Sequence, residues 1–119
     1  MIRFAALLAI AATALALVAS IGAAPTATTT LKGAVGPSAT ISLKKGSARV
    51  SSLTRGRYTF VVSDRSGEHN FHLRGPVSRM ITSVSGTGTT TVTLNLKPGR
   101  YTYVCDPHSD EMIGSFRVK

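Results

Sequence analysis

The chain has 119 residues, of which 14 are Lys or Arg and 5 are Asp or Glu, so its net charge is +9. Charged residues make up 16% of the chain and apolar residues 43%, a balance that suits a folded domain and excludes an intrinsically disordered one. Cys105 is the only cysteine, which excludes an internal disulfide framework and a four-cysteine zinc site.

Residues 1–24 have the pattern of a secretory signal peptide, which we expect to be helical. Arg3 gives the start a positive charge, residues 4–21 are almost entirely apolar, and small residues follow at 22–24. An uncleaved membrane anchor is the alternative, because an apolar run of about 18 residues is near the lower limit for a bilayer span. Both interpretations predict export, to the periplasm, the cell surface or the extracellular space.

Residues 25–30 predict a short flexible lead-in, and residues 31–119 predict one folded domain. This domain has no helical periodicity, but short β-branched and aromatic stretches separated by turns that contain Gly or Pro. The predicted strands are residues 29–35, 40–44, 57–64, 69–74, 80–85, 89–96, 100–105 and 114–119. Short strands at this spacing predict an all-β protein, an antiparallel sandwich or barrel of about seven to eight strands.

Alternation along the predicted strands places three candidate metal ligands on the core side. His69, Cys105 and Met112 are each in phase with the apolar residues of their strand, whereas His72 is out of phase and is expected at the surface. A register error of one residue would exchange His72 for His69. His108 follows in the loop between Cys105 and Met112, where Asp-Pro breaks the strand and lets the chain turn back.

A thiolate, two imidazoles and a thioether are the donor set of a blue copper centre. The sulfur donors favour Cu(I) and the imidazoles also bind Cu(II), so one site can hold both oxidation states. Taken singly, each residue has an ordinary alternative. A buried free cysteine or a methionine that fills a gap in the core is common in folded domains.

Residues 101–116 resemble the copper loop of the plastocyanin/azurin-type cupredoxins, through Cys-x-x-His followed by Met. The pair His69-Asn70 resembles the upstream ligand motif of the same family. The resemblance implies a Greek-key β-sandwich, one copper ion and one-electron transfer between partner proteins. It implies that Asn70 ties the two ligand loops together and that the partly exposed His108 is the point of electron entry. The implied copper ligands are His69, Cys105, His108 and Met112.

The copper loop departs from the family pattern in its charge. Asp106, Asp110 and Glu111 lie where the family usually has an apolar patch. Negative charge near the metal favours the cupric state, so we expect it to lower the reduction potential.

An electron carrier is therefore the predicted function, and an enzyme is not expected. Four protein ligands leave no open position for a substrate, and the chain has no Gly-rich oxyanion loop. Two alternatives stay open: an exported copper carrier or buffer that hands over the ion itself, and a metal-free β-sandwich that binds a partner.

The basic residues are spread along the chain without interleaved aromatic residues, so no nucleic-acid partner is expected. Net charge steers association, and it favours an acidic redox partner, an anionic membrane surface or an acidic wall polymer. Simple solvation of scattered charges is the alternative. Contact with a membrane would come only from an uncleaved leader or from surface attraction, and we expect a monomer.

Overall fold

The structure is a computed structural model, and it describes residues 12–17 and 27–119. Residues 1–11 and 18–26, which include most of the predicted signal peptide and the first two residues of the lead-in, lie outside the described residues, so the signal helix stays a prediction. Within the described part of the chain, no helix has the length and apolar character needed to cross a membrane.

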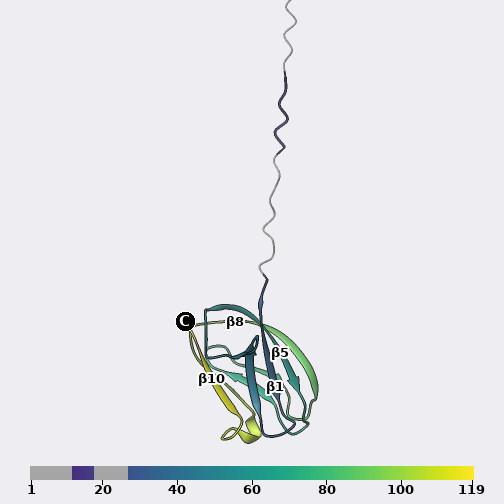
Figure 1. The fold of residues 1–119 in the computed structure, drawn as a ribbon, viewed down its shortest axis with the longest axis vertical. Coiled ribbons are helices and arrows are strands. Elements are labelled where there is room, and N and C mark those ends of the chain that lie inside the picture. Colours follow the sequence, from purple (N-terminus) through teal and green to yellow (C-terminus); the bar gives the residue numbers. More distant parts are fainter. Residues whose placement is uncertain (1–11, 18–26) are drawn as a thin grey trace, which may run out of the picture.

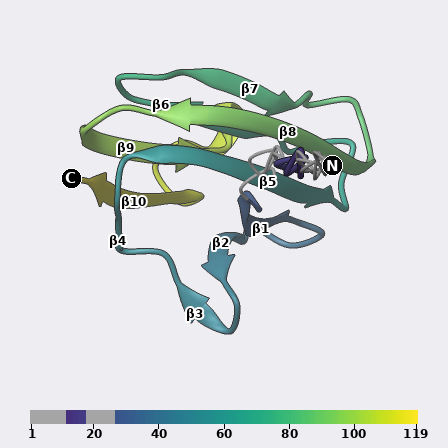
Figure 2. The same ribbon diagram turned by 90° about the horizontal axis from the view of Figure 1, so that it is seen from above.

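Ten strands form two five-stranded sheets that pack face to face (Figure 1, Figure 2). The first sheet has the order β3-β2-β1-β5-β8, with β1 (Thr29–Val35), β2 (Ile41–Lys45), β3 (Ala48–Arg49), β5 (Gly56–Asp64) and β8 (Gly88–Leu96). The second has the order β4-β10-β9-β6-β7, with β4 (Ser52–Leu53), β6 (Phe71–Arg74), β7 (Arg79–Thr82), β9 (Gly99–Val104) and β10 (Ile113–Val118). The predicted all-β sandwich is confirmed.

Two details of the prediction are wrong. The sheets are mixed, because β1 pairs in parallel with β5 and β10 pairs in parallel with β4, while the other strand pairs are antiparallel. Strand direction depends on long connections that leave no local sequence pattern. The number of strands is also higher than predicted, because β3 and β4 have two residues each and are too short to show alternation.

The strand predicted at residues 69–74 is shorter in the structure. β6 begins at Phe71, so His69 and Asn70 lie in the loop before it. The register against β7 shifts between Phe71 and His72, which marks a bulge at the start of the strand. Similarly, β9 ends at Val104, and Cys105 is the first residue beyond it. The candidate ligands therefore lie just outside the strands.

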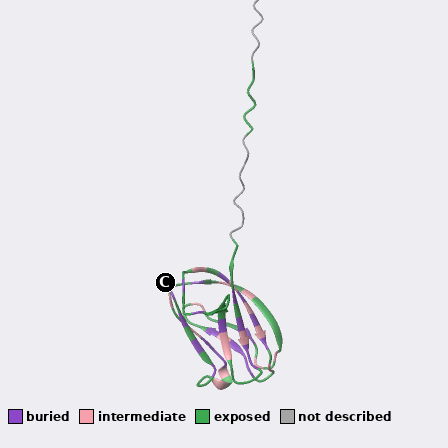
Figure 3. Ribbon diagram, viewed as in Figure 1, coloured by how far each residue is buried: buried purple, intermediate pink, exposed green. Residues whose placement is uncertain are grey.

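The buried apolar residues of the described chain all lie between Leu31 and Val118, and nearly all of them form one cluster between the two sheets. Aromatic rings stack between the strands of the second sheet, with Phe71 on Tyr103 and Tyr101 on Phe116. Residues 27–30, which lead into the sandwich, are exposed (Figure 3). Because the buried core of the described residues lies within residues 31–118, we expect residues 27–119 to fold without the predicted leader.

The strand directions define two ends of the sandwich. β5 and β9 end where the loop of residues 65–70 meets the one-turn 3-10 helix η1 (Asp106–His108), which we call the copper end. β1 begins at the opposite end, where β5 also begins, because Thr29 is paired with Tyr58 in parallel register. Figure 1 shows η1 at the end of the sandwich away from the start of β1.

Candidate metal centre

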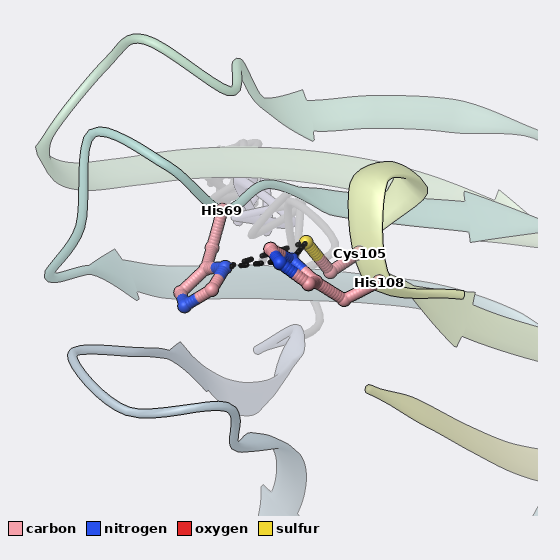
Figure 4. Close-up of side chains that lie close together, drawn as sticks. All are labelled: His69, Cys105 and His108. Atoms are coloured by element: carbon pink, nitrogen blue, oxygen red, sulfur yellow. Dashed lines mark hydrogen bonds between the residues drawn. The ribbon is translucent and has the colours of Figure 1, made fainter. Parts of the chain in front are cut away.

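His69, Cys105 and His108 converge at the copper end (Figure 4). The Sγ atom of Cys105 lies 3.7 Å from Nδ1 of His69 and 3.6 Å from Nδ1 of His108, and the two Nδ1 atoms are 3.1 Å apart. The two rings meet edge to face, with an interplanar angle of 76°. One sulfur and two nitrogens therefore point toward one another from two segments of the chain, the loop of residues 65–70 and the segment from Cys105 to His108.

Backbone hydrogen bonds close the loop that carries two of these residues. The amide of His108 donates to the carbonyl of Cys105 (3.1 Å), and the amide of Met112 donates to the carbonyl of His108 (2.8 Å). The amide of Cys105 in turn donates to the carbonyl of Met112 (3.0 Å). Pro107 in the first turn of η1 suits this tight return of the chain. Met112, at the end of this loop, is fully buried.

The loop between β1 and β2 supports His69 from the other side. Gly36 has a left-handed φ of 71°, and a Cβ atom there would lie 2.9 Å from Cβ of Ser66 and 3.3 Å from Cδ2 of His69. A larger residue would therefore be strained and would push on the imidazole. The glycine lets the backbone approach the ring closely and leaves His69 only 6% exposed.

Asn70 joins the two segments that carry the candidate ligands. Its Nδ2 donates to the carboxylate of Asp106 (2.8 Å), and its Oδ1 accepts from the backbone amide of Asp106 (2.7 Å). Asn70 is completely buried. His69 directly precedes Asn70 in the chain, and Cys105 directly precedes Asp106. This pair of hydrogen bonds fixes the distance between the loop of residues 65–70 and the start of η1.

Asp106 also contacts the side chains of His72 and Arg74. Its carboxylate accepts from Nδ1 of His72 at 3.0 Å and forms an ion pair with Arg74. Burial alone would raise the pKa of Asp106, but the hydrogen bonds from Asn70 and His72 and the charges of His72 and Arg74 together lower it. Asp106 therefore stays ionised, and neighbouring groups compensate its charge.

The spacing of the three donor atoms fits a trigonal metal ion. For bonds of about 2.0 Å to nitrogen and 2.3 Å to sulfur, a trigonal plane separates sulfur from each nitrogen by about 3.7 Å and the nitrogens by about 3.5 Å. The distances from sulfur to nitrogen match this value, and the two imidazoles need to part by only a few tenths of an ångström. A thiolate with two imidazoles is also the donor set that suits copper.

The structure thus brings together three of the four predicted ligands. Met112 lies at the site through its backbone contacts to Cys105 and His108. His72 lies outside the cluster, in agreement with its outward phase. It is half-buried and contacts Asp106, which the phase did not predict. The sequence did not predict the ion pair between Arg74 and Asp106. Arg74 shares the outward phase of His72, but the sequence does not show that β6 and β9 are neighbours.

A two-sheet sandwich that brings a buried cysteine and two histidines together at one end has the architecture and donor set of a small copper-binding protein. The sequence profile of the copper binding proteins of the plastocyanin/azurin family matches residues 37–119. Since this match covers more than half of the chain, the protein belongs to this family. A search of curated protein sequences finds no match to the chain.

Solved structures share the fold. Reduced rusticyanin at 1.9 Å resolution is 21% identical, with 76% of this chain and 78% of that chain covered and a TM-score of 0.57. A rusticyanin variant with methionine replaced by glutamine is 19% identical, with 76% of each chain covered and a TM-score of 0.53. A chain of a heme-copper terminal oxidase dimer is 20% identical, with 76% of this chain and 63% of that chain covered and a TM-score of 0.52.

Proposed function

We propose that this protein is an exported type 1 (blue) copper protein that carries single electrons between redox partner proteins. The observation that carries the proposal is the convergence of Cys105 Sγ with Nδ1 of His69 and Nδ1 of His108 within 3.7 Å. A copper ion bound to these atoms would alternate between Cu(I) and Cu(II) and so exchange one electron at a time.

Met112 is proposed as the fourth, weaker ligand. Its amide and carbonyl are bonded to His108 and Cys105, so its side chain starts from the wall of the same site. The side chain is fully buried, which favours a thioether turned toward the interior. Asn70 would hold the ligand loops in place while the metal changes charge, as hydrogen bonds behind metal ligands generally do.

His108 is proposed as the point where electrons enter and leave. Cys105 and His69 are buried, whereas His108 is half-buried and lies on η1 at the tip of the sandwich. A partner that docks on the copper end would reach its ring before any other candidate ligand. The chain would then act as a carrier without an enzymatic step, because four protein ligands leave no position for a substrate.

The burial of the site favours an electron carrier over a copper carrier or buffer. Cys105 is 0% exposed and His69 is 6% exposed, so release of the ion would require the loops to open. The hydrogen bonds between Asn70 and Asp106 oppose this opening. Electron transfer requires no such motion, because an electron can pass through the half-buried imidazole of His108.

A Cu(II) titration followed by visible and electron-paramagnetic spectra tests this proposal. We expect one equivalent to give an intense blue or green colour that reduction removes and oxidation restores. Cys105→Ser should abolish the colour, and Met112→Leu should keep it but change the reduction potential. The control variant His72→Gln should keep the colour, because His72 lies outside the cluster. Binding of Cu(I) by a protein that stays colourless when oxidised would instead indicate a copper carrier.

Export and partners belong to the same proposal. The leader of residues 1–24 would direct the domain to the periplasm, the cell surface or the medium, where it would act as a monomer between redox proteins. Fractionation of cells that express the full chain tests export, and analytical ultracentrifugation tests the monomer. Recovery in the cytoplasm would contradict export, and a stable dimer would contradict the monomer.

A further inference from the structure

The fold places the acidic residues at one end of the sandwich and a cluster of basic residues at the other, while Arg65 lies in the copper-end loop and Arg74 pairs with Asp106. All five acidic residues are close in sequence to the candidate ligands, in or next to the two loops at the copper end. They are Asp64, Glu68, Asp106, Asp110 and Glu111. Of the 14 basic residues, six gather at the opposite end, where β5 and β9 begin and β8 and β10 end. They are Arg55, Arg57, Lys97, Arg100, Arg117 and Lys119, which we call the basic end.

The register of the strands brings these six residues together. Arg117 is directly opposite Arg100 in the antiparallel pair of β10 and β9. The amide of Arg55 donates to the carbonyl of Lys119, which joins the segment before β5 to the end of β10. Arg57 is paired with Asn95, two residues before Lys97. The basic end therefore spans both sheets.

Folding alone does not explain this cluster. All six side chains are exposed, and in the described part of the chain none of them forms an ion pair. A concentrated positive surface without acidic neighbours instead attracts an extended anionic surface.

The path of the chain identifies that surface. β1 begins at the basic end with Thr29, and the apolar run of residues 4–21 precedes it. The connection of about seven residues between them can span at most about 25 Å. In the uncleaved form, where residues 4–21 stay in the bilayer as an anchor, the basic end must therefore lie close to the headgroups.

We propose that the basic end lies on an anionic membrane surface, with the copper end pointing away from it. Anionic headgroups would attract the six cations and would repel the acidic residues of the copper end, so both halves of the charge distribution favour this orientation. His108 would then face the aqueous phase. Only this last consequence rests on the proposed function.

An acidic redox partner is a weaker explanation for the basic end. β5 and β8 have nine residues each, so they separate the basic end from the copper end by about 30 Å. A protein held at the basic end would be too far from His108 to exchange electrons. At the copper end itself, a partner would meet Asp110 and Glu111, both of which are exposed.

Vesicle binding by residues 27–119 tests the proposal without the leader. We expect the domain to sediment at low salt with vesicles of phosphatidylglycerol and phosphatidylcholine and to dissociate from them as the salt concentration rises. It should not bind vesicles of pure phosphatidylcholine. The copper-free and copper-loaded forms should bind alike. A protein that fails to bind copper could therefore still bind vesicles, and a protein that fails to bind vesicles could still bind copper.

Two matched triple variants separate a local cluster from net charge. Both remove three positive charges and should keep the circular dichroism spectrum of the parent domain. The test variant is Arg57→Gln, Lys97→Gln and Arg100→Gln, from the basic end. The control variant is Lys32→Gln, Lys44→Gln and Arg49→Gln, which removes a row of paired residues across β1, β2 and β3.

Each basic residue near an anionic membrane contributes roughly a fivefold factor in affinity. We expect the test variant to bind at least about 20-fold more weakly, and the control less than threefold. In hydrogen exchange, vesicles should protect residues 54–57 and 97–100 and leave residues 106–112 unchanged. Equal loss in both triple variants, protection of the copper loop, or binding to soluble polyglutamate but not to anionic vesicles would each overturn the proposal.

Discussion

Asn70→Ala tests the contact that holds the two ligand loops together. The substitution removes a hydrogen bond to the ionised carboxylate of Asp106 at 2.8 Å and one from its backbone amide at 2.7 Å, both in a fully buried position. A neutral hydrogen bond contributes about 1 kcal/mol and one to a charged group about 1.5–3 kcal/mol. We therefore expect the free energy of unfolding to fall by about 2–4 kcal/mol.

Urea unfolding of the copper-free domain, followed by circular dichroism, measures this loss without a contribution from metal binding. For a domain of this size the loss corresponds to a decrease in Tm of roughly 10–25 °C. Asn95→Ala is the matched control, because Asn95 is exposed on β8 and its side chain is not part of the copper end. If both variants unfold within about 0.5 kcal/mol of the parent, the two hydrogen bonds do not stabilise the loops and our reasoning is wrong.

Three further variants or conditions probe the core and the charge of the loop. Gly114→Ala should destabilise the domain by about 1–3 kcal/mol, since its Cβ would overlap the ring of Tyr103, as urea unfolding would show. Burial raises the pKa of Tyr101 despite its backbone hydrogen bonds, so stability should fall as pH rises above about 10, measured by Tm. Asp110→Asn and Glu111→Gln should each raise the reduction potential by about 20–40 mV in a redox titration.

Each of these results has a control. Gly67→Ala should be nearly neutral, because the nearest atom to its Cβ would be 3.8 Å away, and equal destabilisation at Gly114 and Gly67 would contradict the overlap. Tyr101→Phe should lose the alkaline fall in stability attributed to this residue, and an unchanged pH profile would assign the fall to another group. The shifts in potential at Asp110 and Glu111 should shrink at high salt, since both are exposed, and shifts independent of salt would point to a structural cause.

Local patterns predicted those parts of the fold that depend on neighbours in sequence. β1 occupies residues 29–35 as predicted, and β8 alternates between exposed threonines and more buried aliphatic residues. His69 was correctly expected to face the core, but its placement in a strand was wrong. Asn70 uses its side chain to bind Asp106, and the strand starts only after it. This contact joins residues 36 positions apart, so no local pattern contains it.

The candidate site could be predicted because Cys, His and Met are rare in this chain and occur in the order of a known motif. The charges around the site could not be predicted. The sequence shows three acidic residues in the copper loop, but it does not show that Arg74 and His72 bind to Asp106. Only Asp110 and Glu111 therefore remain as uncompensated charges on this loop. We accordingly place the effect on the reduction potential with these two residues and assign Asp106 to holding the loop.

The charge at the two ends of the sandwich also differs in how far the sequence predicts it. The acidic residues lie near the ligands along the chain, so their position is visible in the sequence, but the basic end is assembled from segments between Arg55 and Lys119 by the strand directions. A scattered distribution in sequence thus becomes a concentrated one in space. Because the strands keep the two ends about 30 Å apart, attachment at one end would leave His108 at the other end free for electron exchange.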